Sequence, residues 1–186
     1  MADKEQSLVL QRQRQLKWRS LDWLESLLMM LCGFTLAAFC TSVILDIVTR
    51  EIGRPWLFLQ EVTSTFFIYG IFIGAAVATR RNDHLYLAAI GDSMTGLPRL
   101  FIELFIRVIV IAVGLFLVWF GYVNFLRGFA SFRMPSMTPI ASLYAAIPLS
   151  GALVALFAFE QLVNGWRNGF ESPPEPDPAA EPREGA

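Results

Sequence analysis

The chain has 186 residues, with 15 basic residues, 16 acidic residues, one histidine and a net charge of −1. Apolar residues make up 55% and charged residues only 17%, whereas soluble domains carry about 25% charge. A single core of this size cannot hide so much apolar surface from water, so we expect much of it to face lipid. The neutral balance gives no reason to expect a nucleic-acid partner, and one histidine is too few for a zinc enzyme or a haem anchor.

Several stretches of the sequence contain no acidic or basic residue: Ser26–Leu45, Val62–Thr79, Val108–Leu126 and Met134–Phe159. A hydrocarbon core about 30 Å thick needs about 20 helical residues, and each stretch reaches that length alone or with apolar neighbours. Continuous apolar runs predict helices, because membrane-barrel strands would alternate. The sequence therefore predicts an all-α integral membrane protein. Its membrane domain, residues 21–166, has four transmembrane helices at about 24–46, 57–79, 103–126 and 140–160.

Residues 1–20 form a basic lead-in to the first span. From Gln11 to Leu21, basic, glutamine and apolar residues alternate. An amphipathic helix lying on the membrane surface would give this pattern. A solvated basic tail that only enforces orientation is an equal alternative.

The first span is expected to stay attached to the chain. Its uncharged run of 20 residues exceeds the usual signal-peptide core of about 7–15 residues. Cys32 and Cys40 are eight residues apart on one helix, about 12 Å along its axis, which is too far for a disulfide. We interpret both as small apolar residues of the membrane domain.

A carboxylate stands near the start of the second span. The 18 residues from Glu61 to Thr79 cover about 27 Å of helix, which places Glu61 near the outer interface. We expect an interfacial role with Arg50 or Arg54 as its partner. Ion movement by Glu61 or Glu160 is the less favoured alternative.

One face of the second span carries a small-xxx-small pattern. Gly70 and Gly74 are four residues apart, and Ala78 extends the stripe. Small residues let helices approach closely in lipid. We therefore expect these residues to pack against another span or a partner chain.

The connector between the second and third spans is unusually apolar. Residues 83–99 are interrupted by Gly91, Gly96 and Pro98, so a short amphipathic interfacial helix fits better than another span. His84 lies in this loop, and nothing beside it supplies a second metal ligand or a nucleophile. We therefore expect no enzyme activity, metal or cofactor.

The third and fourth spans carry charged residues at their inner ends. Glu103 and Arg107 have the favourable i, i+4 order and are expected to neutralise each other at the membrane boundary. Glu160 can extend its side chain to the headgroups, and Pro148 predicts a bend within the fourth span. Residues 167–186, rich in Pro, Glu and Ala, predict a disordered tail.

The distribution of Lys and Arg predicts that both termini are cytoplasmic. The side of the termini carries 11 basic residues: Lys4, Arg12, Arg14, Lys17, Arg19, Arg80, Arg81, Arg99, Arg107, Arg167 and Arg183. The opposite side carries four: Arg50, Arg54, Arg127 and Arg133.

Two groups of residues resemble motifs of one transporter family. The first group surrounds the second span: Arg50–Trp56, Glu61, Gly74–Ala76, Arg80 and His84. The second group precedes the fourth span: Met134–Ser136, Tyr144 and Ile147–Pro148. From roughly Leu21 to Trp166 the chain resembles the small membrane subunit (DctQ-type) of tripartite ATP-independent periplasmic (TRAP) transporters. It departs from that family at Leu85–Ala88, which is apolar where an acidic residue often follows the histidine.

The resemblance implies a non-catalytic scaffold in the bacterial inner membrane. Such a subunit anchors a large multi-span subunit that holds the substrate and sodium sites, while a periplasmic binding protein delivers an organic acid. Gly70, Gly74 and Ala78 would then form a subunit-packing face. The interfacial polar anchors would be Arg50, Glu61, Arg80, His84, Glu103 and Arg107. The outer-loop residues available to dock the binding protein would be Arg54, Arg127 and Arg133.

Two other classes of function stay open at this point. One is a self-sufficient small ion-coupled transporter that acts as a homo-oligomer, with Glu61 or Glu160 as its coupling carboxylate. The other is a membrane-embedded enzyme, which would need a nucleophile or metal cluster that the sequence does not display.

Overall fold

The computed structural model describes residues 16–81 and 97–168. These residues form the helices α1 (Asp22–Glu51), α2 (Leu59–Arg81), α4 (Leu97–Arg127), α5 (Ala141–Tyr144) and α6 (Ala146–Asn168). Short 3-10 turns, η2 (Arg19–Leu21) and η3 (Gly128–Ala130), precede α1 and follow α4. Within the described ranges, four helical segments are long and apolar enough to cross a membrane. The fold is all-α, as the sequence predicts.

The helix α1 ends in a glycine turn. Gly53 adopts a positive φ of 74°, its N–H donates to the carbonyl of Arg50 at 3.0 Å, and the N–H of Arg54 donates to that of Thr49 at 3.0 Å. This pair of bonds is a Schellman motif, which satisfies carbonyls that the helix end would leave unpaired. Pro55 follows and cannot continue the helix.

The fourth span is interrupted near its start, where α5 gives way to α6 at Ala145. Pro148 has no N–H to bond the carbonyl of Tyr144 four residues earlier, and its ring crowds that carbonyl. The irregularity that Pro148 predicts is therefore present, one turn before the proline.

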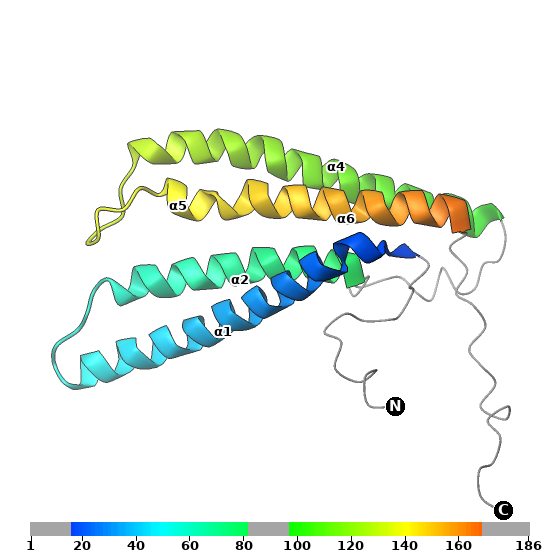
Figure 1. The fold of residues 1–186 in the computed structure, drawn as a ribbon. Coiled ribbons are helices and arrows are strands. Elements are labelled where there is room, and N and C mark those ends of the chain that lie inside the picture. Colours follow the sequence, from blue (N-terminus) through cyan, green and yellow to red (C-terminus); the bar gives the residue numbers. More distant parts are fainter. Residues whose placement is uncertain (1–15, 82–96, 169–186) are drawn as a thin grey trace, which may run out of the picture.

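The four spans stand in a row rather than around a central axis. Among the described residues, the backbone of α1 packs on that of α2, α2 packs on α6, and α6 packs on α4, whereas the backbone of α1 does not come close to that of α4 or α6 (Figure 1). The buried apolar core is accordingly small and lies where α1, α2 and α6 meet: Leu28, Ile73, Ala76, Val77, Val154 and Phe157.

The row has two ends of different character. The start of α1 and the ends of α2 and α6 lie together at one end, which we call the closed end (Figure 1). Residues 52–58 and 131–140 lie at the opposite end, the loop end. The described chain enters α1 and leaves α6 at the same end, as four antiparallel spans require.

Glycine brings α4 and α6 into close contact. A Cβ atom on Gly114 would lie 2.9 Å from the backbone nitrogen of Ala155, and one on Gly121 would lie 2.8 Å from that of Pro148. Gly128, seven residues after Gly121 and at the start of η3, is equally close to Ala141. Any side chain at these positions would push the two helices apart.

The helices α1 and α2 meet along a seam with a seven-residue period. The seam residues of α1 are buried: Leu28, Thr35, Ser42 and Thr49. The hydroxyl of Thr63 on α2 donates to the Ser42 hydroxyl at 2.9 Å. Hydroxyl groups in place of large apolar side chains let the two helices approach in lipid.

Candidate functional site

A buried arginine organises the closed end. Arg80, the penultimate residue of α2, is fully buried. Its Nη1 donates to the Oε2 atom of Glu25 on α1 at 2.7 Å, and its Nε donates to the Oε2 atom of Glu160 on α6 at 3.1 Å. One guanidinium therefore joins three spans, and it also lies over the ring of Phe157, 5.5 Å from the centroid.

The remaining donors of Arg80 reach the segment before α1. Nη1 also donates to the carbonyl of Leu21 at 2.8 Å. Nη2 donates to the carbonyl of Trp18 and to Oδ1 of Asp22, both at 3.0 Å. A buried guanidinium is tolerated only with such saturation, because each unmet donor would cost desolvation energy.

Among the described residues, the charges around Arg80 balance. We define the closed-end cluster as the cations Lys17, Arg80 and Arg81 with the carboxylates Asp22, Glu25 and Glu160. Three positive and three negative groups give a formal charge of zero. Burial lowers the pKa of the Lys17 ammonium, and the Glu25 carboxylate 3.9 Å away opposes that shift. A neutral cluster can lie at the edge of the hydrocarbon without a net charge to solvate.

Residues Leu16–Trp18 attach to α6. The backbone N–H of Trp18 donates to Oε1 of Glu160 at 2.5 Å, and its indole N–H donates to Oδ1 of Asn164 at 2.7 Å. Asn164 in turn donates to the carbonyl of Leu16 at 3.1 Å. Leu16 and Lys17 are buried and Trp18 is half-buried, so these three residues pack against the spans. The two alternatives for the whole lead-in, Gln11–Leu21, stay predictions. Residues 11–15 lie outside the described ranges.

Arg80 and Glu160 are both fully buried in the closed-end cluster. The Glu160 side chain is thus directed to Arg80 rather than extended to the headgroups, and an anchoring role for Arg80 at the membrane boundary stays a prediction. Residues 83–96 of the apolar connector lie outside the described residues. They include His84, the predicted companion of Arg80.

The expected pair on the third span is formed. Arg107 Nη1 donates to the Oε2 atom and, at 3.3 Å, to the backbone carbonyl of Glu103. Both side chains are buried within the protein. The pair is therefore shielded from water by neighbouring side chains as well as placed at a span end.

A second polar group occupies the loop end. We define the loop-end cluster as Glu61, Thr65, Arg133, Ser136 and Thr138. The backbone N–H of Ser136 donates to Oε1 of Glu61 at 3.2 Å, and its hydroxyl donates to Oε2. The guanidinium of Arg133 donates to the Thr65 hydroxyl and to the carbonyl of Glu61, both at 3.1 Å.

The expected partner of Glu61 was wrong. Arg50 pairs instead with Asp46, one turn earlier on α1, at 3.0 Å. Arg54 is exposed in the turn after α1. The loop between α4 and α5 folds against the start of α2 and supplies the contacts to Glu61 that the sequence assigned to the nearer arginines.

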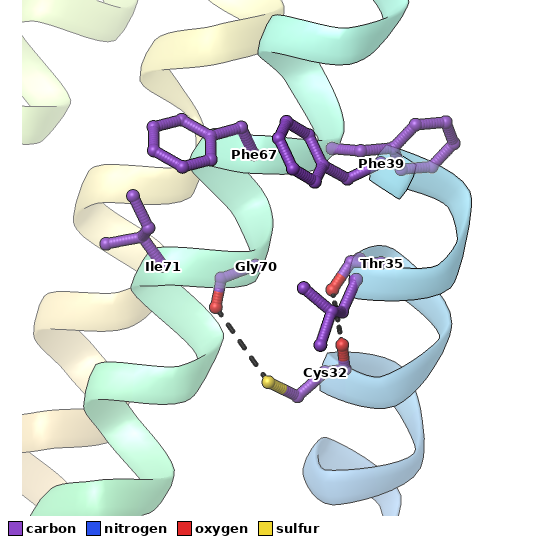
Figure 2. Close-up of a pocket in the computed structure, with 8 residues that line it drawn as sticks. Cys32, Thr35, Phe39, Phe67, Gly70 and Ile71 are labelled. Carbon is purple, nitrogen blue, oxygen red and sulfur yellow. Dashed lines mark hydrogen bonds between the residues drawn. The ribbon is translucent and has the colours of Figure 1, made fainter. Parts of the chain in front are cut away.

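The predicted packing residues of α2 face α1. A Cβ on Gly70 would lie 3.3 Å from the Thr35 hydroxyl, and one on Gly74 would lie 3.6 Å from Sγ of Cys32. Gly70 also lines an apolar groove of about 240 Å³ that opens between the two helices near Phe39 (Figure 2). These glycines are therefore less tightly packed than those of α4.

The charged side chains at the closed end are engaged with one another. The described residues contain no group of three or more His, Cys, Asp or Glu side chains that could hold a metal ion. Their carboxylates at the closed end are occupied by Arg80, Arg81 and Lys17. What the arrangement provides is a way of holding membrane helices together.

Comparison with known proteins gives the family. The model of the DctQ component of tripartite ATP-independent periplasmic transporters matches residues 39–168, well over half of the chain. The chain belongs to this family. The sialic acid TRAP transporter permease protein SiaT of Haemophilus influenzae (strain 86-028NP) is 25% identical over 132 residues, which cover 69% of this chain and 21% of that protein. This chain thus spans about a fifth of the length of that relative.

The matched region places the DctQ-type chain among the membrane subunits of TRAP transporters. It contains Arg80, Glu160 and the whole loop-end cluster, whereas Asp22 and Glu25 precede it. Sequence reasoning singled out Arg80 and Glu160 separately and missed Glu25. The available signal was that all three fall at the same predicted membrane boundary of different spans, where opposite charges can pair.

Proposed function

We propose that this DctQ-type chain is the non-catalytic scaffold subunit of a sodium-coupled transporter that imports an organic acid. The observation that carries the proposal is the row of four spans, fastened at its closed end by Arg80. A row leaves large apolar surfaces exposed on its outer helices, and such surfaces suit contact with lipid and with a larger membrane subunit.

The edge helix α4 offers one such surface. Its exposed large apolar residues include Phe101, Phe105, Phe116, Trp119 and Phe120. We propose that this edge, or the α1–α2 side with Gly70, Gly74 and Ala78, contacts the large subunit. Leucine at both Gly70 and Gly74 should then reduce the amount of large subunit that co-purifies with the chain.

We propose a bacterial inner-membrane location with both termini cytoplasmic, since the basic residues divide 11 to 4 between the two sides. The loop end would then face the periplasm. Arg54 and Arg127 are exposed at this end, and Arg133 is half-buried in the loop between η3 and α5. These cations are the candidates for docking a binding protein, with the strongest role expected for the two exposed ones.

The substrate class is supported by similarity alone. The Haemophilus relative is named for sialic acid, which is a carboxylic acid. We therefore propose an organic acid as substrate, held by the large subunit rather than by this chain.

The self-sufficient transporter is the weaker alternative. A coupling carboxylate has to exchange its ion, but Glu160 is fixed by Arg80 and by the N–H of Trp18. Glu61 lies at the loop end, in the first turn of α2, and not at mid-membrane, where a coupling site is expected.

Uptake of the substrate by proteoliposomes separates the two functions. We expect no uptake with this chain alone, and sodium-dependent uptake when it is combined with the large subunit and the binding protein. The scaffold proposal fails if the chain alone transports and if Glu61→Gln or Glu160→Gln abolishes that transport. Arg50→Gln, which alters an exposed pair, is the matched control.

A further inference from the structure

A pocket at the loop end has a composition unlike the rest of the membrane surface. It encloses about 420 Å³ where residues 131–140 fold against the start of α2. Phe58, Val62 and Phe66 line its apolar side, and Glu61, Arg133 and Ser136 line its polar side. A cavity with a few converging polar groups and aromatic walls is the usual form of a small-ligand site.

The two charges beside this pocket do not neutralise each other directly. Glu61 accepts hydrogen bonds from the backbone N–H and the hydroxyl of Ser136. Arg133 gives its bonds to a hydroxyl and a carbonyl, which occupy two of the five donors of a guanidinium. Neither side chain has an ion pair with any residue in 16–81 or 97–168. A cation and an anion thus stand next to each other with capacity for further partners.

The depth of the pocket matches that of a membrane interface. Glu61 lies in the first turn of the candidate span that begins at Leu59. Phe66 lies five residues further along α2, about 7.5 Å deeper. The exposed Trp56 and Phe58 precede the span, as interfacial aromatic residues do. The polar side therefore lies at headgroup level, and the apolar side extends into the hydrocarbon.

We propose that this pocket binds a zwitterionic phospholipid with a primary ammonium, of the phosphatidylethanolamine class. The free donors of Arg133 hold the phosphate, the Glu61 carboxylate accepts from the ammonium, and an acyl chain follows Val62 and Phe66. A lipid with net negative charge is disfavoured by Glu61, and a quaternary ammonium has no N–H to donate to it. A loop of a soluble protein does not account for an apolar wall that reaches toward Phe66.

The proposal does not depend on the transport function. Native mass spectrometry of the full chain, with any subunit that co-purifies, measures binding of phosphatidylethanolamine, phosphatidylcholine and phosphatidylglycerol with identical acyl chains. We expect the first to bind best. Arg133→Gln should weaken binding of all three by about tenfold, the loss of one charge-assisted contact. Glu61→Gln should abolish the preference for phosphatidylethanolamine while sparing the other two.

Controls distinguish the pocket from general lipid adhesion. Arg50→Gln removes an exposed arginine near the same loop end that does not line the pocket, so it should bind all three lipids as the unchanged chain does. Helical content by circular dichroism verifies that each variant folds. If Arg133→Gln does not fold, Arg133→Lys keeps the charge and should weaken binding while retaining the order of preference.

Two results overturn the proposal. The first is equal binding of phosphatidylethanolamine by the unchanged chain, Glu61→Gln and Arg133→Gln. The second comes from a photo-reactive phenylalanine analogue placed at Phe66 in the assembled complex. Cross-links to phospholipid support the site, whereas cross-links to a protein partner alone show that the pocket is a protein interface.

Discussion

The two polar clusters use the same residue types for different purposes. At the closed end, Arg80 is fully buried and bonded to carboxylates on two other helices. At the loop end, Arg133 is half-buried and bonded only to neutral oxygens. An arginine whose donors are all committed fastens helices, whereas one with donors to spare can bind something else. Burial and partner count, rather than residue type, separate structure from recognition here.

Arg80→Gln should have the largest effect on stability. It leaves Glu160 buried without its cation and takes one of three cations from Glu25, and breaking a buried pair in this way costs about 3–5 kcal/mol. We expect the variant to unfold in detergent at a lower temperature than the unchanged chain. Size-exclusion chromatography of heated samples measures this temperature. Arg50→Gln, in the exposed pair with Asp46, should change stability by about 1 kcal/mol or less. Equal stability of the two variants would remove the distinction between the clusters.

The next effect concerns the close approach of α4 to α6. Gly114→Ala places a methyl group 2.9 Å from a backbone nitrogen and should destabilise the chain by about 1–3 kcal/mol through overpacking. Gly74→Ala meets only the Cys32 sulfur at 3.6 Å and should be nearly neutral. The same unfolding assay applies, and a neutral Gly114→Ala would contradict the close helix contact.

Trp18→Phe tests the docked segment before α1. It removes the indole N–H that Asn164 accepts but keeps most of the ring, so the loss should be about 1 kcal/mol. Trp56→Phe is the matched control, because Trp56 is exposed near the loop end. Unfolding of both variants at the same temperature would show that Leu16–Trp18 adds nothing to the closed end.

The smallest effect on stability is expected at the loop end. Glu61→Gln keeps a side-chain oxygen to accept from Ser136 and leaves no buried cation unpaired. The midpoint of unfolding should move by no more than the equivalent of about 0.5 kcal/mol. A loss of stability as large as that of Arg80→Gln would mean that the loop-end cluster also holds helices together.

Much of the architecture could be predicted from where charges are missing. The uncharged stretches located all four spans, since a charge in the hydrocarbon is costly. Pro148 likewise marked the irregular start of the fourth span. The helices extend beyond the predicted spans because charged side chains are tolerated at helix ends, where the closed-end cluster lies.

The order of the helices in the row could not be predicted. Spans that are apolar on every side present no single face to a neighbour, so the sequence does not say that α2 lies between α1 and α6. The glycines of α4 were missed for a related reason. The seven-residue spacing of Gly114 and Gly121, continued by Gly128 in η3, is less familiar as a packing signal than the four-residue spacing of Gly70 and Gly74.

The polar contacts were missed because they join distant parts of the chain. Glu25 and Arg80 are 55 residues apart, and Glu61 and Ser136 are 75 apart. Local spacing pointed to Arg50 and Arg54 as partners for Glu61. Residues 131–140 supply the partners instead, because this loop folds back against the start of α2. No local pattern in the sequence predicts that the loop folds back.

Co-purification from native membranes tests the scaffold proposal most directly. The chain is isolated in mild detergent and its companions are identified and counted by mass spectrometry. We predict a larger multi-span protein in stoichiometric amount, lost together with thermal stability in Arg80→Gln and retained in Arg50→Gln. A homo-oligomer without such a companion would contradict the scaffold role and make Glu61 and Glu160 the residues to examine for transport.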